Sequence, residues 1–343
     1  IRRPPRSTLF PYTTLFRSYQ SPLNPLPNTD RWDDFLADFA ANDPEVGRVD
    51  FQVVSGGLDD LTTYDCFATD FQMATLAVDE LLPLEPITRA DPNFDDDDFL
   101  PGALAAHTLG GQLLGYPLTI EPLGIEYDVQ AFLGAGVMMP GPTWSLTEFE
   151  TALQTLGETP AFSAYNPSYI LYLAAAYGGL PIDVTTQPYT ANFTDPATIA
   201  ALDAVLEWVR DDRMAFVPQL GIGESFTQLP TAPMTASSAN PLSGVRLSTP
   251  DVAGQVLYPA GTLQLLPFNT RAAYINQGSP SPEACYRLIT AIAARPDLLL
   301  GAMPARSSLI ADPNIAAITD AETVDLYTTV DALLRSGEAI PVY

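Results

Sequence analysis

Glu121 is the residue whose surroundings most directly suggest chemistry. It is the one charged residue in an apolar run from Tyr116 to Ile125. A carboxylate in such a run is costly unless it faces water or a bound molecule. We therefore expect Glu121 to accept hydrogen bonds from hydroxyl or amine groups of a ligand. A surface glutamate that only solvates this part of the strand is the alternative.

Catalytic motifs are missing from the sequence. We find no G-x-S-x-G elbow, no H-E-x-x-H helix and no phosphate-binding loop. Because the chain has 41 Asp and Glu residues, two carboxylates could meet in one cleft by chance, so a glycoside hydrolase remains an alternative. We expect a protein that is not an enzyme and that needs no cofactor.

Metal sites are also not expected. His107 stands in an Ala/Leu-rich run and is predicted to be structural, and one His with two distant cysteines does not form a usual transition-metal site. The acidic run Asp95 to Asp98 lacks the glycine and the spaced ligands of a calcium loop, so we interpret it as a solvated helix start. Whether Cys66 and Cys285 pair stays open, because spacing alone does not decide it.

Length and charge limit the class of protein further. A chain of 343 residues with 47% hydrophobic residues can form two domains, each with its own core. The net charge is −26, and all 15 basic residues are Arg. Nucleic acid is not an expected partner, because its phosphates require a basic surface.

The strand that carries Glu121 is followed by a helix with a clear start signal. Ser145 and Glu148 form a capping box, and Trp144 is spaced to pack on Phe149 across it. Elsewhere the spacing predicts strands at 49–54, 64–68, 256–259 and 272–275. It also predicts a helix around Trp32 to Phe39 and a helix within 162–179. A third helix is predicted after Asp195, with Ile199, Leu202, Leu206 and Val209 facing the core.

The stretch from Gly115 to Leu156 resembles the family 1 extracellular solute-binding proteins, the maltose-type receptors of ABC importers. The matching residues are Gly115, Pro117, Glu121, Pro122, Tyr127, Pro142, Thr143, Trp144 and Phe149. Three further segments resemble the family, namely 162–179, 232–244 and 301–306. The resemblance covers nearly all of the chain from Asp30 to Arg306.

The resemblance implies an α/β fold of the type II periplasmic-binding-protein kind, with two lobes, a hinge and an interlobe cleft. Lobe 1 is expected to comprise residues 19–120 and 268–310, and lobe 2 residues 121–267 and 311–343. It also implies a set of ligand-binding residues. These are Asp70, Phe71, Gln72, Glu121, Tyr165, Asn166, Ser168, Tyr169, Ser238 and Asn240.

The implied function is that of an extracellular or periplasmic receptor, with or without a lipid anchor, that works as a monomer. It would bind a small solute, by family default a sugar, and deliver it to the permease subunits of an ABC importer. The alternatives are a non-sugar solute and a sensor built on the same fold.

Residues Thr8 to Ser18 match the in-frame translation of a common short-read sequencing adapter. We therefore expect residues 1–18 to be an artefact that occupies the place of the family's first strand. From this we expect the first sheet to lack a native strand, and both ends of the native chain to be missing. Deletion of residues 1–18 would then leave stability unchanged or improved.

Overall fold

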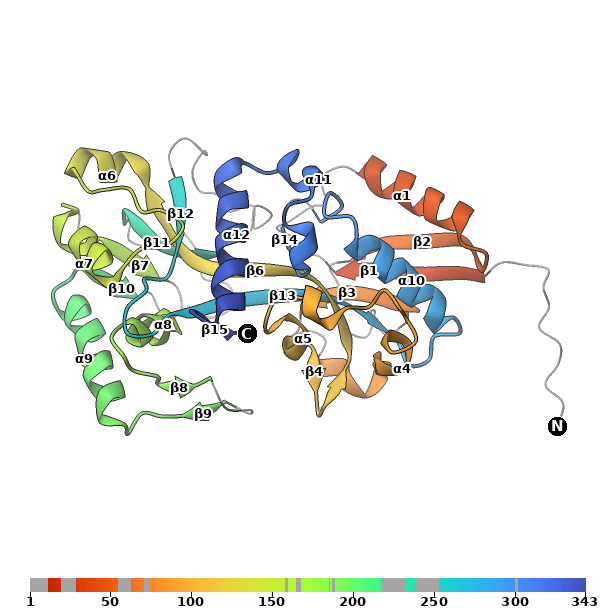
Figure 1. The fold of residues 1–343 in the computed structure, drawn as a ribbon, viewed down its shortest axis with the longest axis horizontal. Coiled ribbons are helices and arrows are strands. Elements are labelled where there is room, and N and C mark those ends of the chain that lie inside the picture. Colours follow the sequence, from red (N-terminus) through yellow and green to blue (C-terminus); the bar gives the residue numbers. More distant parts are fainter. Residues whose placement is uncertain are drawn as a thin grey trace. The chain divides into compact units, whose positions relative to one another are not determined.

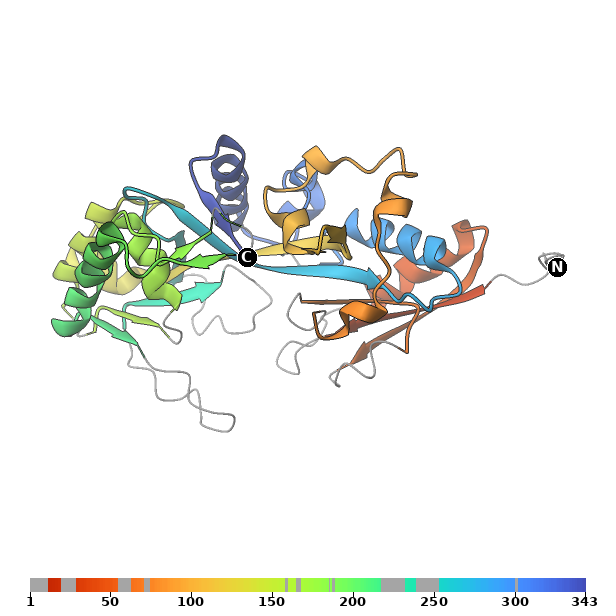
Figure 2. The same cartoon turned by 90° about the horizontal axis from the view of Figure 1, so that it is seen from below.

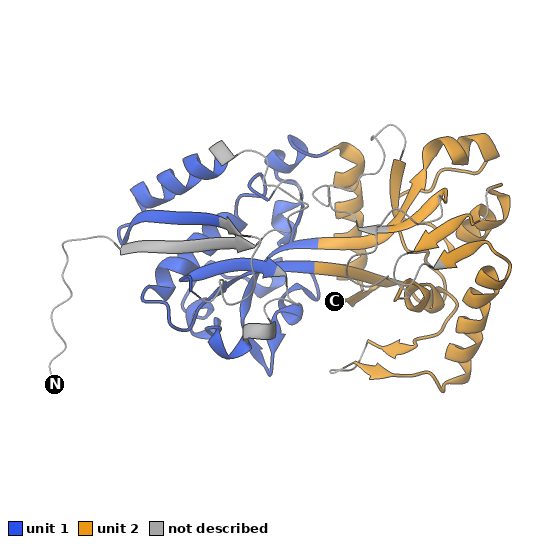
Figure 3. Ribbon diagram, turned by 180° about the vertical axis from the view of Figure 1, so that it is seen from behind, with its two compact units in different colours: residues 1–120, 241–244, 270–319 blue, residues 121–240, 245–269, 320–343 orange. Residues whose placement is uncertain are grey.

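The computed structural model describes residues 12–19, 29–54, 63–70, 75–157, 160–164, 168–184, 186, 189–216, 232–238, 253–299 and 302–343. The chain divides into two compact units (Figure 3). Unit 1 is Ile1–Ile120, Pro241–Gly244 and Thr270–Thr319, and unit 2 is Glu121–Asn240, Val245–Asn269 and Asp320–Tyr343. The long strands β6 (Gly115–Asp128) and β13 (Leu265–Ile275) each contribute residues to both units.

Unit 1 is built on a mixed sheet that contains the order β2-β1-β3-β13. β1 runs parallel to β2 and β3, whereas β13 is antiparallel to β3. The elements of unit 1 besides β6 and β13 are β1 (Tyr12–Tyr19), α1 (Thr29–Asn42), β2 (Val46–Val54), β3 (Cys66–Asp70), η1 (Thr75–Glu80), α4 (Glu85–Thr88), η2 (Asp96–Asp98), α5 (Ala103–Ala106), β4 (Thr108–Leu109), β5 (Gln112–Leu113), α10 (Pro282–Ala293), β14 (Met303–Pro304), η4 (Ser307–Leu309) and α11 (Pro313–Ala316).

Helices α1 and α10 lie on the same face of this sheet (Figures 1 and 2). The amphipathic pattern of α1 places Trp32 in the core, where its ring stacks on Phe51 of β2 with centroids 4.7 Å apart. α10 is fastened to β3 by a disulfide between Cys66 and Cys285, both fully buried. The open question about the two cysteines is thus answered in favour of pairing.

The segment that matches the adapter occupies a strand position in the sheet of unit 1. Residues Tyr12–Tyr19 form β1 and fill the position between β2 and β3. Pairing with β2 runs from Tyr12 to Tyr19, and pairing with β3 runs from Phe16 to Ser18. The physical reason is that strand pairing satisfies backbone N–H and C=O groups whatever the side chains are, so an extended segment of any origin can complete a sheet.

The acidic run is a short 3₁₀ helix, and one of its carboxylates is not simply solvated. Asp95 caps η2, accepting a hydrogen bond from the Asp97 N–H. Asp98 accepts a hydrogen bond from Nε of Arg306 at 2.6 Å and another from the Ser308 hydroxyl at 2.7 Å. Burial alone would raise the pKa of Asp98, but these bonds outweigh it and lower that pKa below 3.8.

This ion pair should make the stability of unit 1 fall in acid. A carboxyl group with a depressed folded-state pKa stabilises the fold above its unfolded pKa, and that contribution is lost as pH falls through the folded value. We expect Arg306→Gln to lower the free energy of unfolding by a constant amount between pH 5 and 7. The difference in the free energy of unfolding between the variant and the parent protein should become smaller below about pH 4. Urea unfolding across pH 3 to 7 measures this, and a gap that does not depend on pH would contradict it.

The strands of unit 2 follow the order β10-β7-β11-β6, and β12 also pairs with β6. β11 and β12 are antiparallel to β6, while β15 runs parallel to β13. The elements of unit 2 besides β6 and β13 are α6 (Val129–Ala135), α7 (Leu146–Thr155), β7 (Phe162–Ala164), α8 (Ser168–Ala176), β8 (Ile182–Asp183), β9 (Thr190–Ala191), α9 (Pro196–Arg210), β10 (Met214–Phe216), β11 (Met234–Ser238), β12 (Ala253–Leu257), α12 (Ala321–Ser336) and β15 (Ile340–Val342).

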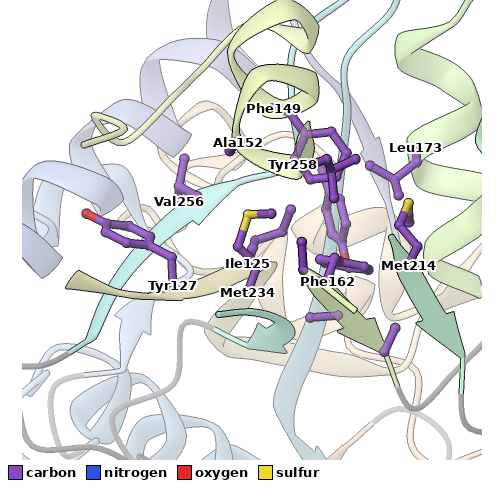
Figure 4. Close-up of a cluster of buried hydrophobic side chains, with 14 of the residues drawn as sticks. Ile125, Tyr127, Phe149, Ala152, Phe162, Leu173, Met214, Met234, Val256 and Tyr258 are labelled. Carbon is purple, nitrogen blue, oxygen red and sulfur yellow. The ribbon is translucent and has the colours of Figure 1, made fainter. Parts of the chain in front are cut away.

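The core of unit 2 gathers side chains from the sheet and from α7 and α8, including Ile125, Phe149, Phe162, Met234 and Tyr258 (Figure 4). The predicted capping box at the start of α7 is present in full, with Ser145 and Glu148 bonded reciprocally. The Trp144 ring packs edge-on against Phe149 with centroids 5.3 Å apart. These two predictions are confirmed.

The predicted buried face of α9 is partly wrong. Asp195 caps the helix as expected, accepting a hydrogen bond from the Thr198 N–H. However, Ile199 is 50% exposed, and the buried positions are Thr198, Ala201 and Val205. Gly179 explains this, because a side chain there would come within 2.6 Å of the Ala201 Cβ. The close approach requires small residues on the α9 face that meets it.

Candidate ligand-binding site

Glu121 is the first residue of β6 that is not buried. Every residue from Gly115 to Ile120 is buried, and Glu121 is half-buried. Within the described ranges, Glu121 forms no hydrogen bond or ion pair with another residue. A half-buried carboxylate that has no partner among the described residues can accept hydrogen bonds from a ligand.

The register of the unit 2 sheet brings Ser238 close to Glu121 along the backbone. Ser238 is the last residue of β11, and its Cα partner on β6 is Leu123, two positions after Glu121. These two predicted residues, 117 positions apart in sequence, therefore belong to one corner of the sheet.

Tyr169 of α8 joins this corner through Tyr258. β12 pairs with β6, and its last residue, Leu257, lies opposite Gly124. Tyr258 is the next residue in the chain after β12. The Tyr169 and Tyr258 rings stack with centroids 5.9 Å apart and planes 24° apart. Because Tyr258 is 1% exposed, only the half-buried Tyr169 ring can offer a surface to a ligand, and its stacking on Tyr258 holds that ring in place.

The electrostatics support the proximity of Tyr169 and Glu121. Burial raises the pKa of the Tyr169 phenol, and the negative charge of Glu121 raises that pKa further. Tyr169 therefore remains a neutral hydrogen-bond donor at any physiological pH. The Glu121 charge acts on the Tyr169 phenol, so a charged acceptor and a neutral donor belong to the same part of unit 2.

The other predicted residues have different outcomes. Ser168 is half-buried and begins α8, next to Tyr169. Asp70 ends β3 in unit 1, where its Cα partner on β13 is Arg271. Five residues lie outside the described ranges, namely Phe71, Gln72, Tyr165, Asn166 and Asn240. The structure thus groups Glu121, Tyr169 and the backbone of Ser238, with Ser168 adjacent.

Tyr258 was not predicted from the sequence. It is 1% exposed, and its hydroxyl has no hydrogen-bond partner among the residues that the structure describes. Burial, then the neighbouring Tyr169 and Tyr172, raise the pKa of Tyr258 well above its usual value. The signal that could have identified Tyr258 is its position as an aromatic residue at the end of a predicted strand. That strand, β12, pairs with β6, which carries Glu121.

Tyr172 and Tyr177 are packing residues of unit 2. Both pack against the unit 2 core. The Tyr177 hydroxyl donates to Glu150 at 2.8 Å and accepts from the Trp208 indole at 2.9 Å. None of the three side chains in this network belongs to the predicted ligand set.

No metal centre is found in the described part of the chain, where no group of three or more His, Cys, Asp and Glu side chains is placed to hold an ion. His107 is fully buried, with Nδ1 2.9 Å from the Tyr274 hydroxyl, and burial lowers its pKa to about 3. His107 is therefore a neutral core residue, as predicted. None of the described helices is long and apolar enough to cross a membrane.

Two cavities lined by described residues of unit 1 contain none of the predicted ligand residues. One of about 740 Å³ lies between α1 and α10 and is lined by Phe35, Phe39 and Arg287 among others. Its charged groups are already paired, since Arg287 binds Asp43 at 2.6 Å and Glu45 at 3.1 Å. We regard this hollow as a packing feature of unit 1.

Comparison with known proteins gives matches at the level of structure. No protein-family model matches the chain, and no curated protein sequence matches it. Among solved structures, the cyclic alpha-maltosyl-1,6-maltose binding protein from Arthrobacter globiformis is similar, with a TM-score of 0.70 and 17% sequence identity. The match covers 97% of this chain and 88% of that one.

Two further structures are similar over most of their length. The GacH receptor of Streptomyces glaucescens, solved unliganded and with acarbose, matches with a TM-score of 0.68, 18% identity and coverage of 97% and 88%. The sugar-binding protein MalE from Xanthomonas citri matches with a TM-score of 0.66, 17% identity and coverage of 95% and 93%. The predicted fold class is therefore confirmed: the chain has the α/β fold of the periplasmic binding proteins.

Proposed function

We propose that this chain is the solute-binding receptor of an ABC importer and that it captures a small solute, most simply a sugar. The observation that carries the proposal is the half-buried carboxylate of Glu121, which has no hydrogen-bond or ion-pair partner among the described residues and whose charge acts on the half-buried Tyr169. Carboxylates bind sugar hydroxyl groups and aromatic rings cover the apolar faces of sugar rings, so the combination suits such a ligand.

The similar structures support this choice. Their names describe binding proteins for sugars or for sugar-like compounds such as acarbose, and none describes an enzyme. In the proposal, units 1 and 2 are the two lobes, and β6 and β13 belong to the hinge. Closure of the lobes around the solute would create the form that the membrane permease recognises.

The disulfide supports a location outside the cytoplasm. Cross-links of this kind persist in oxidising compartments, such as the periplasm and the cell exterior. We propose that the protein acts there as a monomer, either free or held by a lipid anchor, and that it delivers its solute to permease subunits.

A thermal-shift screen of the full chain tests the ligand class. The panel should contain maltose and longer maltodextrins, single sugars, amino acids and polyamines. A ligand at a hundredfold excess over its dissociation constant stabilises the protein by about 2.7 kcal/mol. Stabilisation by amino acids or polyamines alone would point to a non-sugar solute, and stabilisation by none of the panel would count against the receptor function.

Glu121→Gln should weaken binding of maltose roughly tenfold to a hundredfold. The reason is that hydrogen bonds to a charged acceptor are worth about 1.5 to 3 kcal/mol, part of which is lost with the charge. Calorimetric titration measures this. Glu126→Gln is the matched control, because it removes the same charge from the opposite face of the same strand. Unchanged affinity in Glu121→Gln would remove Glu121 from the site.

A further inference from the structure

Tyr258 packs against two aromatic rings of α8. Tyr169 and Tyr172 are three positions apart in this helix, so their side chains share one of its faces. The Tyr258 ring stacks on Tyr169 with centroids 5.9 Å apart, and its centroid lies 5.4 Å from that of Tyr172. Tyr258 is 1% exposed, whereas Tyr169 is half-buried. A fully buried ring therefore supports one that is partly accessible.

The chain on either side of Tyr258 is held by hydrogen bonds to the segment before α7. Before Tyr258, the Leu257 N–H donates to the Pro142 carbonyl at 3.0 Å, and the Leu257 carbonyl accepts from the Trp144 indole at 2.9 Å. After it, the Ala260 N–H donates to the Trp144 carbonyl at 2.8 Å. Tyr258 cannot move away from α8 unless hydrogen bonds on both sides of it break.

The same segment also contacts the C-terminal end of α8. The Thr262 N–H donates to the carbonyl of Ala176, the last residue of the helix, at 2.8 Å. Gly261 permits this approach, because a Cβ at that position would collide with the Ala176 carbonyl oxygen. Residues 258–262 thus contact α8 near its start, through the Tyr169 ring, and at its end.

We propose that Tyr258 is a positioning residue of the solute site, which fixes the Tyr169 ring in the orientation that the solute contacts. This inference rests on the proposed function. A side chain that is already fixed loses less conformational entropy when a ligand immobilises it, and one side chain changes the affinity by roughly threefold to tenfold in this way. Because Tyr258 is buried, it acts through Tyr169 and does not touch the solute.

Calorimetric titration of the full chain with maltose tests the assignment. Tyr258→Leu removes the flat ring and should weaken maltose binding roughly threefold to tenfold. Tyr258→Phe keeps the ring and should bind maltose as the parent does. Phe132→Leu is the matched control, because Phe132 is also fully buried in the unit 2 core and its ring packs on Tyr127. The control should lower the stability of the unliganded protein in urea and leave the affinity unchanged.

A double-mutant cycle separates positioning from a general loss of structure. Tyr169→Ala removes the contacting ring and should weaken maltose binding at least as much as Tyr258→Leu does. If Tyr258 acts through Tyr169, adding Tyr258→Leu to Tyr169→Ala should cause no further loss of affinity. An equal loss in both backgrounds would show that Tyr258 acts by another route, which overturns the assignment.

The other outcomes are equally decisive. Parental affinity in Tyr258→Leu or in Tyr169→Ala would overturn this inference and leave the proposed function standing. A loss in Tyr258→Phe as large as that in Tyr258→Leu would show that the hydroxyl acts, not the ring, and would overturn it too. If Tyr258→Leu does not fold, Tyr258 is a structural residue and the inference is wrong. If maltose does not bind the parent protein, the proposed function fails for glucose-based sugars, and this inference fails with it.

Discussion

Deletion of residues 1–19 is expected to unfold unit 1 or to reduce its stability by at least about 5 kcal/mol. β1 pairs along its whole length with β2 and over three positions with β3. Each backbone hydrogen bond contributes about 0.5 to 1.5 kcal/mol, and buried groups left without partners cost about 1 to 3 kcal/mol each. The summed loss is comparable to the whole stability of a domain.

Hydrogen exchange of the backbone amides in β2 and β3 measures this effect directly, because it reports on unit 1 without averaging over unit 2. Deletion of residues 1–11, which stops short of β1, is the control. A point variant, Phe16→Pro, should lower the stability of unit 1 by about 1 to 3 kcal/mol. The reason is that proline removes one N–H donor from a strand that is paired on both sides. Unchanged protection of β2 and β3 after the longer deletion would show that the sheet does not depend on β1.

Replacement of both Cys66 and Cys285 by serine is expected to lower the free energy of unfolding by about 2 to 4 kcal/mol. The cross-link closes a loop in which the two cysteines are 219 residues apart, and long loops lose the most conformational entropy in the unfolded chain. Both residues are fully buried, so the serine hydroxyl groups would also enter an apolar environment.

Urea unfolding of the parent protein, with and without a reductant, gives the matched comparison. The reduced parent should approach the double-serine variant, since both lack the cross-link. The unfolding transition should be followed by the exchange of β3 and α10 amides, because a protein of two units need not unfold in a single step. If the variant and the oxidised parent have equal stability, the disulfide contributes nothing to the folded state.

The sequence was sufficient for features that depend on local chemistry. The helix start at Ser145 and Glu148 needs only residues within one turn, and it was predicted correctly. The overall α/β class followed from the resemblance to the family 1 solute-binding proteins, which rests on motif residues such as Gly115, Pro117 and Trp144. Residue Glu121 stood out because one charge in an apolar run is visible without any structure.

Features that depend on long-range geometry were not predictable. The register that places Ser238 opposite Leu123, and the stacking of Tyr169 on Tyr258, join residues that no local pattern connects. Ile199 was misplaced because the face of α9 is chosen by the close approach of Gly179, not by the periodicity of α9 alone. The pairing of β1 with both β2 and β3 was not predictable either, because a sheet selects a strand by its backbone and not by a local side-chain pattern.

The interleaving of the two units along the chain also sets the order of events during synthesis. Cys66 leaves the ribosome 219 residues before Cys285, and the main segment of unit 2 lies between them. At about 5 to 20 residues per second, the first thiol waits roughly 10 to 45 s for the second. During that time, unit 1 has neither α10 nor its share of β13. The unit that begins the chain is therefore the one that is completed and cross-linked late, and an oxidant that acts too early would find Cys66 as a lone thiol.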